Sequence, residues 1–182
     1  MDSGLIPCPF CDHEVIAGSD ECDGCGQPLT DQHLPVPATL VERRLLTDRL
    51  SACAHKPPIC VSPTMPLREV LRILVDNRIG CVLVLEKGAL VGIFTERDVL
   101  RKVGENARAF ADRPVGDFMT KGVHTLQSRC KIAFAVHRMD LGGFRHVPLV
   151  DYQGHPTGIL SVRDVLHHLT SLIREARDQA DA

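Results

Sequence analysis

The sequence predicts an α/β (α+β) protein: two β-α-β-β-α repeats packed as a pseudo-two-fold pair, preceded by a small N-terminal element built on cysteines. Two observations carry this prediction. Residues 81–100 align without gaps on residues 147–166, with nine of 20 positions identical at an offset of 66. Such self-similarity marks a duplicated supersecondary unit whose halves cover each other's apolar surface. The cysteines form two Cys-x2-Cys pairs near the N-terminus.

Charge divides the chain into two chemically different parts near residue 34. Residues 1–33 contain seven acids and no Lys or Arg, whereas the remainder holds all 21 basic residues against 16 acids. Aromatic residues make up only 4% of the chain, which argues against a nucleic-acid platform built on stacked rings. The N-terminus has no basic start followed by an apolar segment, and no apolar run is long enough for a membrane span, so we expect a cytoplasmic protein.

The paired cysteines predict a structural zinc site. Cys8 and Cys11 are separated by ten residues from Cys22 and Cys25, and two such turns supply four thiolates at tetrahedral angles. A segment this small and polar needs metal binding for most of its folding free energy. The alternatives are unligated thiols or a redox Cys-x2-Cys pair. His13 and His33 are possible substitute ligands, although surface roles fit them better. The stretch resembles the short zinc ribbons of many bacterial and archaeal proteins.

Each repeat is predicted to run strand, helix, hairpin, helix. The first strands fall at 59–61 and 123–126. Leu67, Val70, Leu71, Leu74 and Val75 give the first helix its apolar face, and Ala133, Val136 and Met139 give that of the second, before a loop at 140–143. Glycine-containing turns at 86–88 and 151–154 indicate hairpins. The final helices begin at Thr95 and Ser161. A helix is also predicted over 38–55, after a Pro-containing spacer at 34–37.

This order resembles the cystathionine-β-synthase (CBS) domain. The stretches from Gly92 to Asp98 and from Gly158 to Asp164 match the end motif of that family, and the stretch from Arg145 to Asp151 matches its strand entry. We therefore expect a zinc ribbon at 1–33, a linker and helix at 34–56, CBS domains at 57–113 and 114–170, and a fraying helical tail at 171–182. The resemblance implies a Bateman module, paired into a homodimer, that binds AMP, ATP or a related adenosyl ligand in a cleft between the two domains.

The resemblance also implies which residues hold the nucleotide. Asp98 and Asp164 would bind ribose, Thr95 and Ser161 would contact phosphate or ribose, and adenine would lie near 59–61 and 123–125. A Thr/Ser-x-x-Asp motif is equally a helix capping box, so capping alone is an open alternative. A strand feeding a helix at this point favours a phosphate.

Arg145 and His146 are the best phosphate candidates, although such a pair can be simply solvated. The first copy has Ile79 and Gly80 at the aligned positions, with Arg78 one residue earlier, so we expect unequal sites.

Three classes of function remain to be weighed. A ligand-sensing regulator with the ribbon available for protein contact fits best. A nucleic-acid-binding transcriptional regulator using the ribbon is the alternative, and it is opposed by the ribbon's lack of cations, which supply most non-specific nucleic-acid affinity. An enzyme fits worst, because no nucleophile, base and orienting group occur together and a four-cysteine zinc site has no open position.

Overall fold

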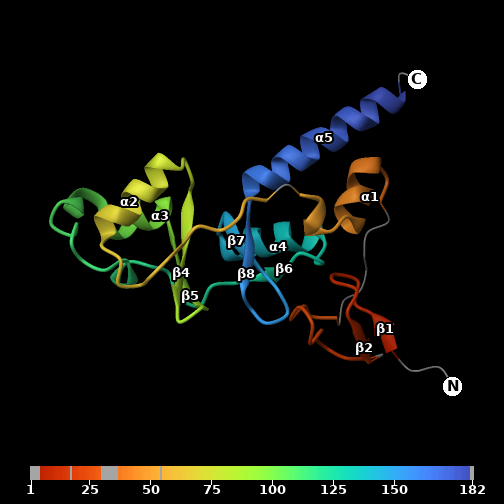
Figure 1. Cartoon of the computed structure of the whole chain (residues 1–182). Coiled ribbons are helices and arrows are strands. Elements are labelled where there is room, and N and C mark those ends of the chain that lie inside the picture. Colours follow the sequence, from red (N-terminus) through yellow and green to blue (C-terminus); the bar gives the residue numbers. More distant parts are fainter. Residues whose placement is uncertain (1–4, 17, 30–36, 54, 181–182) are drawn as a thin grey trace. The chain divides into compact units, whose positions relative to one another are not determined.

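The computed structural model describes residues 5–16, 18–29, 37–53 and 55–180 (Figure 1). The predicted spacer at 34–37 lies outside the described residues apart from Pro37, and His33 lies outside them too. The chain divides into two compact units, described separately here. The first-copy unit comprises 56–125 and 148–159, and the ribbon unit comprises the described parts of 1–55, 126–147 and 160–182.

The first-copy unit contains the first predicted repeat. Its elements are β3 (Cys60–Val61), α2 (Leu67–Asp76), β4 (Cys81–Glu86), β5 (Ala89–Thr95) and α3 (Glu96–Asp98), which continues into a π-helical segment (Val99–Val103). β3 pairs with β4 in parallel and β4 pairs with β5 antiparallel. The predicted order β-α-β-β-α is therefore confirmed. The hairpin turns where expected because Gly88 takes a left-handed φ of +85° that favours glycine.

The apolar face of α2 packs against this sheet. Leu67, Val70 and Leu74 are buried in one cluster with Val82 and Val84 of β4 and Phe94 of β5. The prediction was wrong for Val75, which is 73% exposed. Val75 comes eight residues after Leu67, which places it about 80° around the helix from Leu67, at the edge of the apolar face.

The ribbon unit begins with an antiparallel hairpin of β1 (Leu5–Pro7) and β2 (Glu14–Ile16), red in Figure 1. It continues with α1 (Leu40–Thr47), a 3-10 turn (Leu50–Ala52), β6 (Leu126–Gln127), α4 (Ile132–Gly142) and α5 (Val162–Ala180). β6 pairs in a sheet of order β6-β7-β8, in which β7 (His146–Val150) and β8 (Pro156–Ser161) have their residues 148–150 and 156–159 in the first-copy unit. The helix predicted over 38–55 is thus shorter, because the chain leaves α1 at Asp48 in an extended conformation.

The predictions for the apolar face of α4 and for the loop after it were wrong. α4 buries Ile132, Phe134, Ala135 and Met139 and leaves Val136 41% exposed, and it runs through the predicted loop to Gly142. Phe134 lies about 200° around the helix from Ile132, so α4 is buried on two sides. A prediction that assumes one apolar stripe therefore assigns the wrong buried face. The segment predicted as a helical tail at 171–182 is helical to Ala180, as part of α5, and Leu172 within it is only 1% exposed.

Candidate functional site

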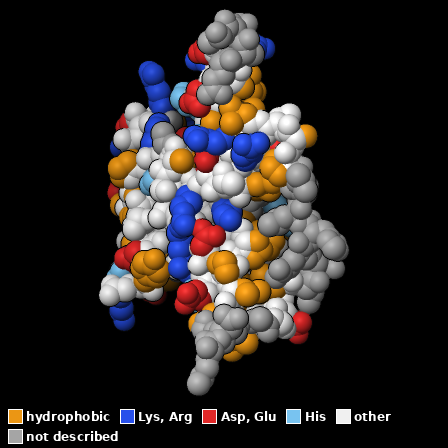
Figure 2. All heavy atoms as spheres, turned by 90° about the vertical axis from the view of Figure 1, so that its right-hand side faces the viewer, with side chains coloured by type: hydrophobic (Ala, Val, Ile, Leu, Met, Phe, Trp, Pro, Cys, Tyr) orange, Lys and Arg blue, Asp and Glu red, His pale blue; other side chains and the backbone are white. Residues whose placement is uncertain are grey.

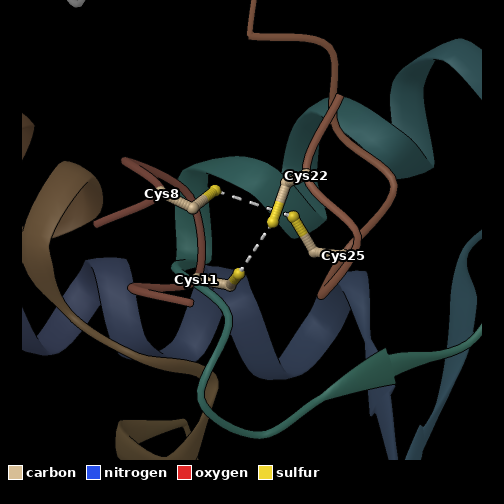
Figure 3. Close-up of side chains that lie close together, drawn as sticks. All are labelled: Cys8, Cys11, Cys22 and Cys25. Atoms are coloured by element: carbon tan, nitrogen blue, oxygen red, sulfur yellow. Dashed lines mark hydrogen bonds between the residues drawn. The ribbon is translucent and has the colours of Figure 1, made fainter. Parts of the chain in front are cut away.

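The four predicted metal ligands converge. The sulfur atoms of Cys8, Cys11, Cys22 and Cys25 all lie within 4.8 Å of one another (Figure 3). The Cys8 and Cys25 sulfurs are 3.9 Å apart, and those of Cys11 and Cys22 are 3.7 Å apart. Four Zn–S bonds of about 2.3 Å at tetrahedral angles require sulfurs about 3.8 Å apart. This group therefore has the ligand set and spacing of a closed four-thiolate metal site.

The turns around the cysteines follow from local backbone bonds. The Phe10 amide points at the Cys8 sulfur at 3.4 Å, and the Cys8 amide donates to the His13 carbonyl at 2.8 Å. Gly26 has a left-handed φ of +67°. Gly24 is needed for space instead, because a Cβ there would strike the His13 ring.

Burial favours the neutral thiol at two of the four cysteines. Burial raises the pKa of Cys11 to about 12, and it also raises the pKa of Cys25, to which the neighbouring Cys11 adds. Four sulfurs so close together cannot all carry negative charge without a compensating ion. A divalent metal supplies that charge and takes up the deprotonated form.

In the second copy, the predicted nucleotide residues gather where β8 feeds α5. The Ser161 hydroxyl donates to Oδ2 of Asp164 at 2.6 Å, and the Ser161 amide donates to the same oxygen at 2.7 Å. The Val162 amide donates to the Arg145 carbonyl at 3.0 Å, which holds the start of β7 beside the start of α5. Arg145 is exposed and His146 is partly buried. The structure therefore brings Arg145, Ser161 and Asp164 to one edge of the ribbon unit.

In the first copy, the corresponding acid is enclosed. Asp98 is 6% exposed, and its Oδ2 accepts the Thr95 hydroxyl at 2.7 Å and the Thr95 amide at 3.0 Å. Its Oδ1 accepts the Thr120 hydroxyl at 2.9 Å and lies 2.7 Å from the Lys102 ammonium. Burial by itself would raise the pKa of Asp98, but the bonds from Lys102, Thr95 and Thr120 outweigh it and lower that pKa.

The two copies differ at the residue one turn after the acid. His168 occupies the position aligned with Lys102, and its Nε2 lies 3.3 Å from Oδ2 of Asp48, not beside Asp164. Sequence reasoning missed Lys102 and Thr120. The i,i+4 spacing of Asp98 and Lys102 was a usable signal, whereas nothing in the local sequence ties Thr120 to Asp98, 22 residues earlier.

A cavity of about 580 Å³ lies within the first-copy unit. Its lining includes Val123 and Thr125, from one of the two stretches predicted to contact adenine, and the glycine turns at 88 and 154. The remaining cysteines are mostly core residues, as expected: Cys53, Cys81 and Cys130 are 2–3% exposed, and Cys60 is exposed. Among the described residues, no helix combines the length and apolarity needed to cross a membrane.

Known proteins resemble this chain over its repeats. A 125-residue stretch is 28% identical to an uncharacterised 17.7 kDa protein of Acidianus ambivalens, covering 68% of this chain and 74% of that protein. The structure of a CBS-domain-containing protein from Agrobacterium tumefaciens is 32% identical, with a TM-score of 0.58, over 63% of this chain and 90% of that one. The structure of a CBS domain protein from Pyrobaculum aerophilum complexed with AMP is 28% identical, with a TM-score of 0.58, over 68% of this chain and 98% of that one.

The family model for the CBS domain matches the chain twice, at residues 50–105 and 115–171. These ranges contain the two motifs from Gly92 to Asp98 and from Gly158 to Asp164, and they leave the four-cysteine cluster outside. The chain belongs to the CBS domain family and carries its domain in tandem.

Proposed function

We propose that this protein is a non-catalytic regulatory protein that binds an adenine nucleotide at the second copy, through Arg145, His146, Ser161 and Asp164. The observation that carries the proposal is the bonded Ser161–Asp164 pair beside Arg145 at the start of α5. The AMP complex of the Pyrobaculum aerophilum relative supports the choice of ligand. AMP, ADP and ATP share the adenosine part that this edge would recognise.

Each residue has a chemical role in the proposal. The Arg145 guanidinium favours a phosphate, because it offers directed N–H donors to an anion. His146 lies beside Arg145 and would add a further donor. The Asp164 carboxylate accepts the two hydroxyls of a ribose. Ser161 holds Asp164 in place and contacts the same ligand.

We propose that the first copy contributes little to nucleotide binding. Thr95 and Asp98 already bond each other, and the Lys102 ammonium neutralises the carboxylate on its other oxygen. A ribose would have to displace Thr120 or Lys102 from a nearly buried acid, which costs a charge-assisted hydrogen bond. Asp98 therefore serves the fold of the first copy.

The cysteine cluster is proposed to hold one zinc ion per chain. All four positions of a tetrahedral ion would be filled by protein sulfur, so the ion would have no open position for substrate, in keeping with a non-catalytic role. The side of the molecule that carries the ribbon shows Lys and Arg side chains interspersed with Asp and Glu (Figure 2). The sequence of the ribbon itself, residues 1–33, contains no Lys or Arg, which opposes binding of a nucleic-acid backbone by the ribbon.

Titration of AMP, ADP and ATP, with GMP as a control, tests the nucleotide proposal. We expect an adenine nucleotide to raise the melting temperature of the full chain, because a ligand that binds only the folded state stabilises it. Asp164→Ala should abolish this shift, whereas Asp98→Asn should retain it. An unchanged melting temperature with every adenosyl compound would refute the proposal, and a shift lost equally in both variants would refute the inequality of the copies.

A further inference from the structure

Helix α4 begins without a cap of its own. Lys131 occupies the N-cap position, and no side chain within the described residues caps the helix there. The first amides of a helix need acceptors from elsewhere. The Lys131 amide donates to the Phe10 carbonyl at 2.9 Å, and the Ile132 amide donates to the Asp48 carbonyl at 3.0 Å. One of these two acceptors belongs to the ribbon.

A ring contact covers the same end of the helix. The rings of Phe10 and Phe134 lie 5.7 Å apart between centroids and are inclined at 48°. Phe134 is 2% exposed, although it lies on the side of α4 away from Ile132 and Met139. Aromatic pairs in this arrangement stabilise beyond their area alone. The ribbon thus supplies part of the core of the second copy.

An acid next to a metal ligand completes the contact. Asp12 follows Cys11, and its Oδ2 lies 2.6 Å from a guanidinium nitrogen of Arg49 while its Oδ1 lies 3.4 Å from the Lys131 ammonium. Asp12 has a left-handed φ of +59°, which the turn around the cysteines imposes. Arg49 and Lys131 are themselves bridged by backbone pairing, so one carboxylate joins two segments of the unit.

These contacts depend on the fold of the cysteine turn. Phe10 lies between Cys8 and Cys11, and Asp12 lies directly after them. The described part of residues 1–29 buries few large apolar side chains, Val15 and Leu29 among them. Because a segment so poor in core depends on its metal to fold, the positions of the Phe10 carbonyl and the Asp12 carboxylate depend on the metal as well.

We propose that the metal-loaded ribbon is the N-terminal cap of α4, so that a thiophilic divalent cation at the four cysteines stabilises the second CBS copy. This inference rests on the metal site proposed above. It makes the metal a second ligand, besides the nucleotide, that stabilises the second copy. Linkage makes the coupling reciprocal: whatever stabilises the start of α4 also tightens the metal site. The cation acts at a distance, through Phe10 and Asp12.

Hydrogen exchange of the full chain, zinc-loaded and after chelation, tests the inference. We expect chelation to speed exchange of peptides covering residues 130–136 by about tenfold or more, because local opening then lacks the cap. Peptides covering α2, in the first-copy unit, should exchange as before. Metal analysis of the same samples establishes the loading. Unchanged exchange at 130–136 after complete removal of the metal would overturn the inference and leave the metal site standing. Absence of bound metal would overturn both.

Matched variants separate capping from general ribbon folding. Asp12→Asn removes the pairs with Arg49 and Lys131, whereas Asp23→Asn makes the same change at an acid that pairs with His13 inside the ribbon, at 3.1 Å. Both should retain about one zinc per chain, but only Asp12→Asn should reduce the effect of zinc on residues 130–136. Arg49→Gln, on the other side of the pair, should act like Asp12→Asn without altering the ribbon sequence. Equal effects of Asp12→Asn and Asp23→Asn, or none from Arg49→Gln, would contradict the proposal.

Discussion

The ammonium of Lys102 lies 2.7 Å from Oδ1 of Asp98, an acid that is only 6% exposed. The pair lies at the start of the helical segment in the first copy, whereas the second copy has a histidine turned to another acid at the aligned position. This difference is the basis for proposing that Asp164, and not Asp98, is the carboxylate available to a ligand.

Asp98→Asn should lower the free energy of unfolding by about 1.5–3 kcal/mol, the range for hydrogen bonds to a charged group. The asparagine amide lacks the negative charge that attracts the Lys102 ammonium and strengthens the hydrogen bond from Thr120. Urea denaturation measures the loss. Asp164→Asn is the matched change in the second copy, and it should cost about 1 kcal/mol or less because only the bonds with Ser161 are affected. Equal losses would show that Lys102 adds nothing.

The stability that Asp98 provides should depend on pH. The folded-state pKa of Asp98 is lowered, relative to about 3.9 in an unfolded chain. A lowered pKa contributes stability that is fully present above the unfolded value and is lost as the pH falls through the folded one. The difference in unfolding free energy between wild type and Asp98→Asn should therefore be constant from about pH 5 to about pH 7, above the unfolded pKa of about 3.9, and shrink below about pH 4. A difference that grows on acidification would contradict this sign.

Arg145→Gln should weaken AMP binding by roughly ten- to a hundredfold, because a charge-assisted bond to phosphate contributes about 1.5–3 kcal/mol. Arg145 is exposed, so the melting temperature without nucleotide should hardly change. Isothermal titration calorimetry measures the affinity. Arg174→Gln, at an exposed position of α5, is the control for net charge, and an equal loss there would remove Arg145 from the site.

Thiol labelling should find one fast-reacting cysteine in the zinc-loaded native protein. Cys60 is exposed, although partial burial raises the pKa of its thiol. Cys53 and Cys81 are buried, and burial raises the pKa of Cys53 to about 11 and that of Cys81 to about 12. Reactive thiols are accessible and able to ionise. Mass spectrometry of alkylated peptides identifies the site, and chelation should add the four metal ligands. Several fast cysteines before chelation would mean that the cluster is not closed.

Leu172→Ala should destabilise the protein by about 2–5 kcal/mol, as for other buried leucines. Ile173→Ala provides the control one residue later, where the side chain is 44% exposed, and it should cost about 1 kcal/mol or less. Chemical denaturation compares the two. Similar small effects would mean that α5 frays from residue 171, as the sequence alone predicted.

The repeat and the cysteine cluster could be predicted because each depends on local spacing. Nine identities at one offset reveal the duplication, and Gly88 and Gly154 adopt the left-handed φ that their hairpins require. The buried face of α4 could not be predicted, because Phe134 is covered by a ring 124 residues earlier, that of Phe10. The partners of Asp98 were missed for a similar reason: Thr120 reaches it only through the fold. The acidic composition of residues 1–33 suggested a ribbon separate from the repeats, whereas the described part of the ribbon shares a compact unit with α4 and α5.

Both Thr/Ser-x-x-Asp motifs close a hydrogen-bonded turn at the start of a helix. A CBS copy that stops binding nucleotide would therefore keep its signature, since the turn needs the same two residues. The motif alone would then not establish how many ligands such a tandem protein holds. We propose the residue four positions after the acid as a discriminator: a cation that bonds the carboxylate, as Lys102 does, would mark a copy that holds no nucleotide.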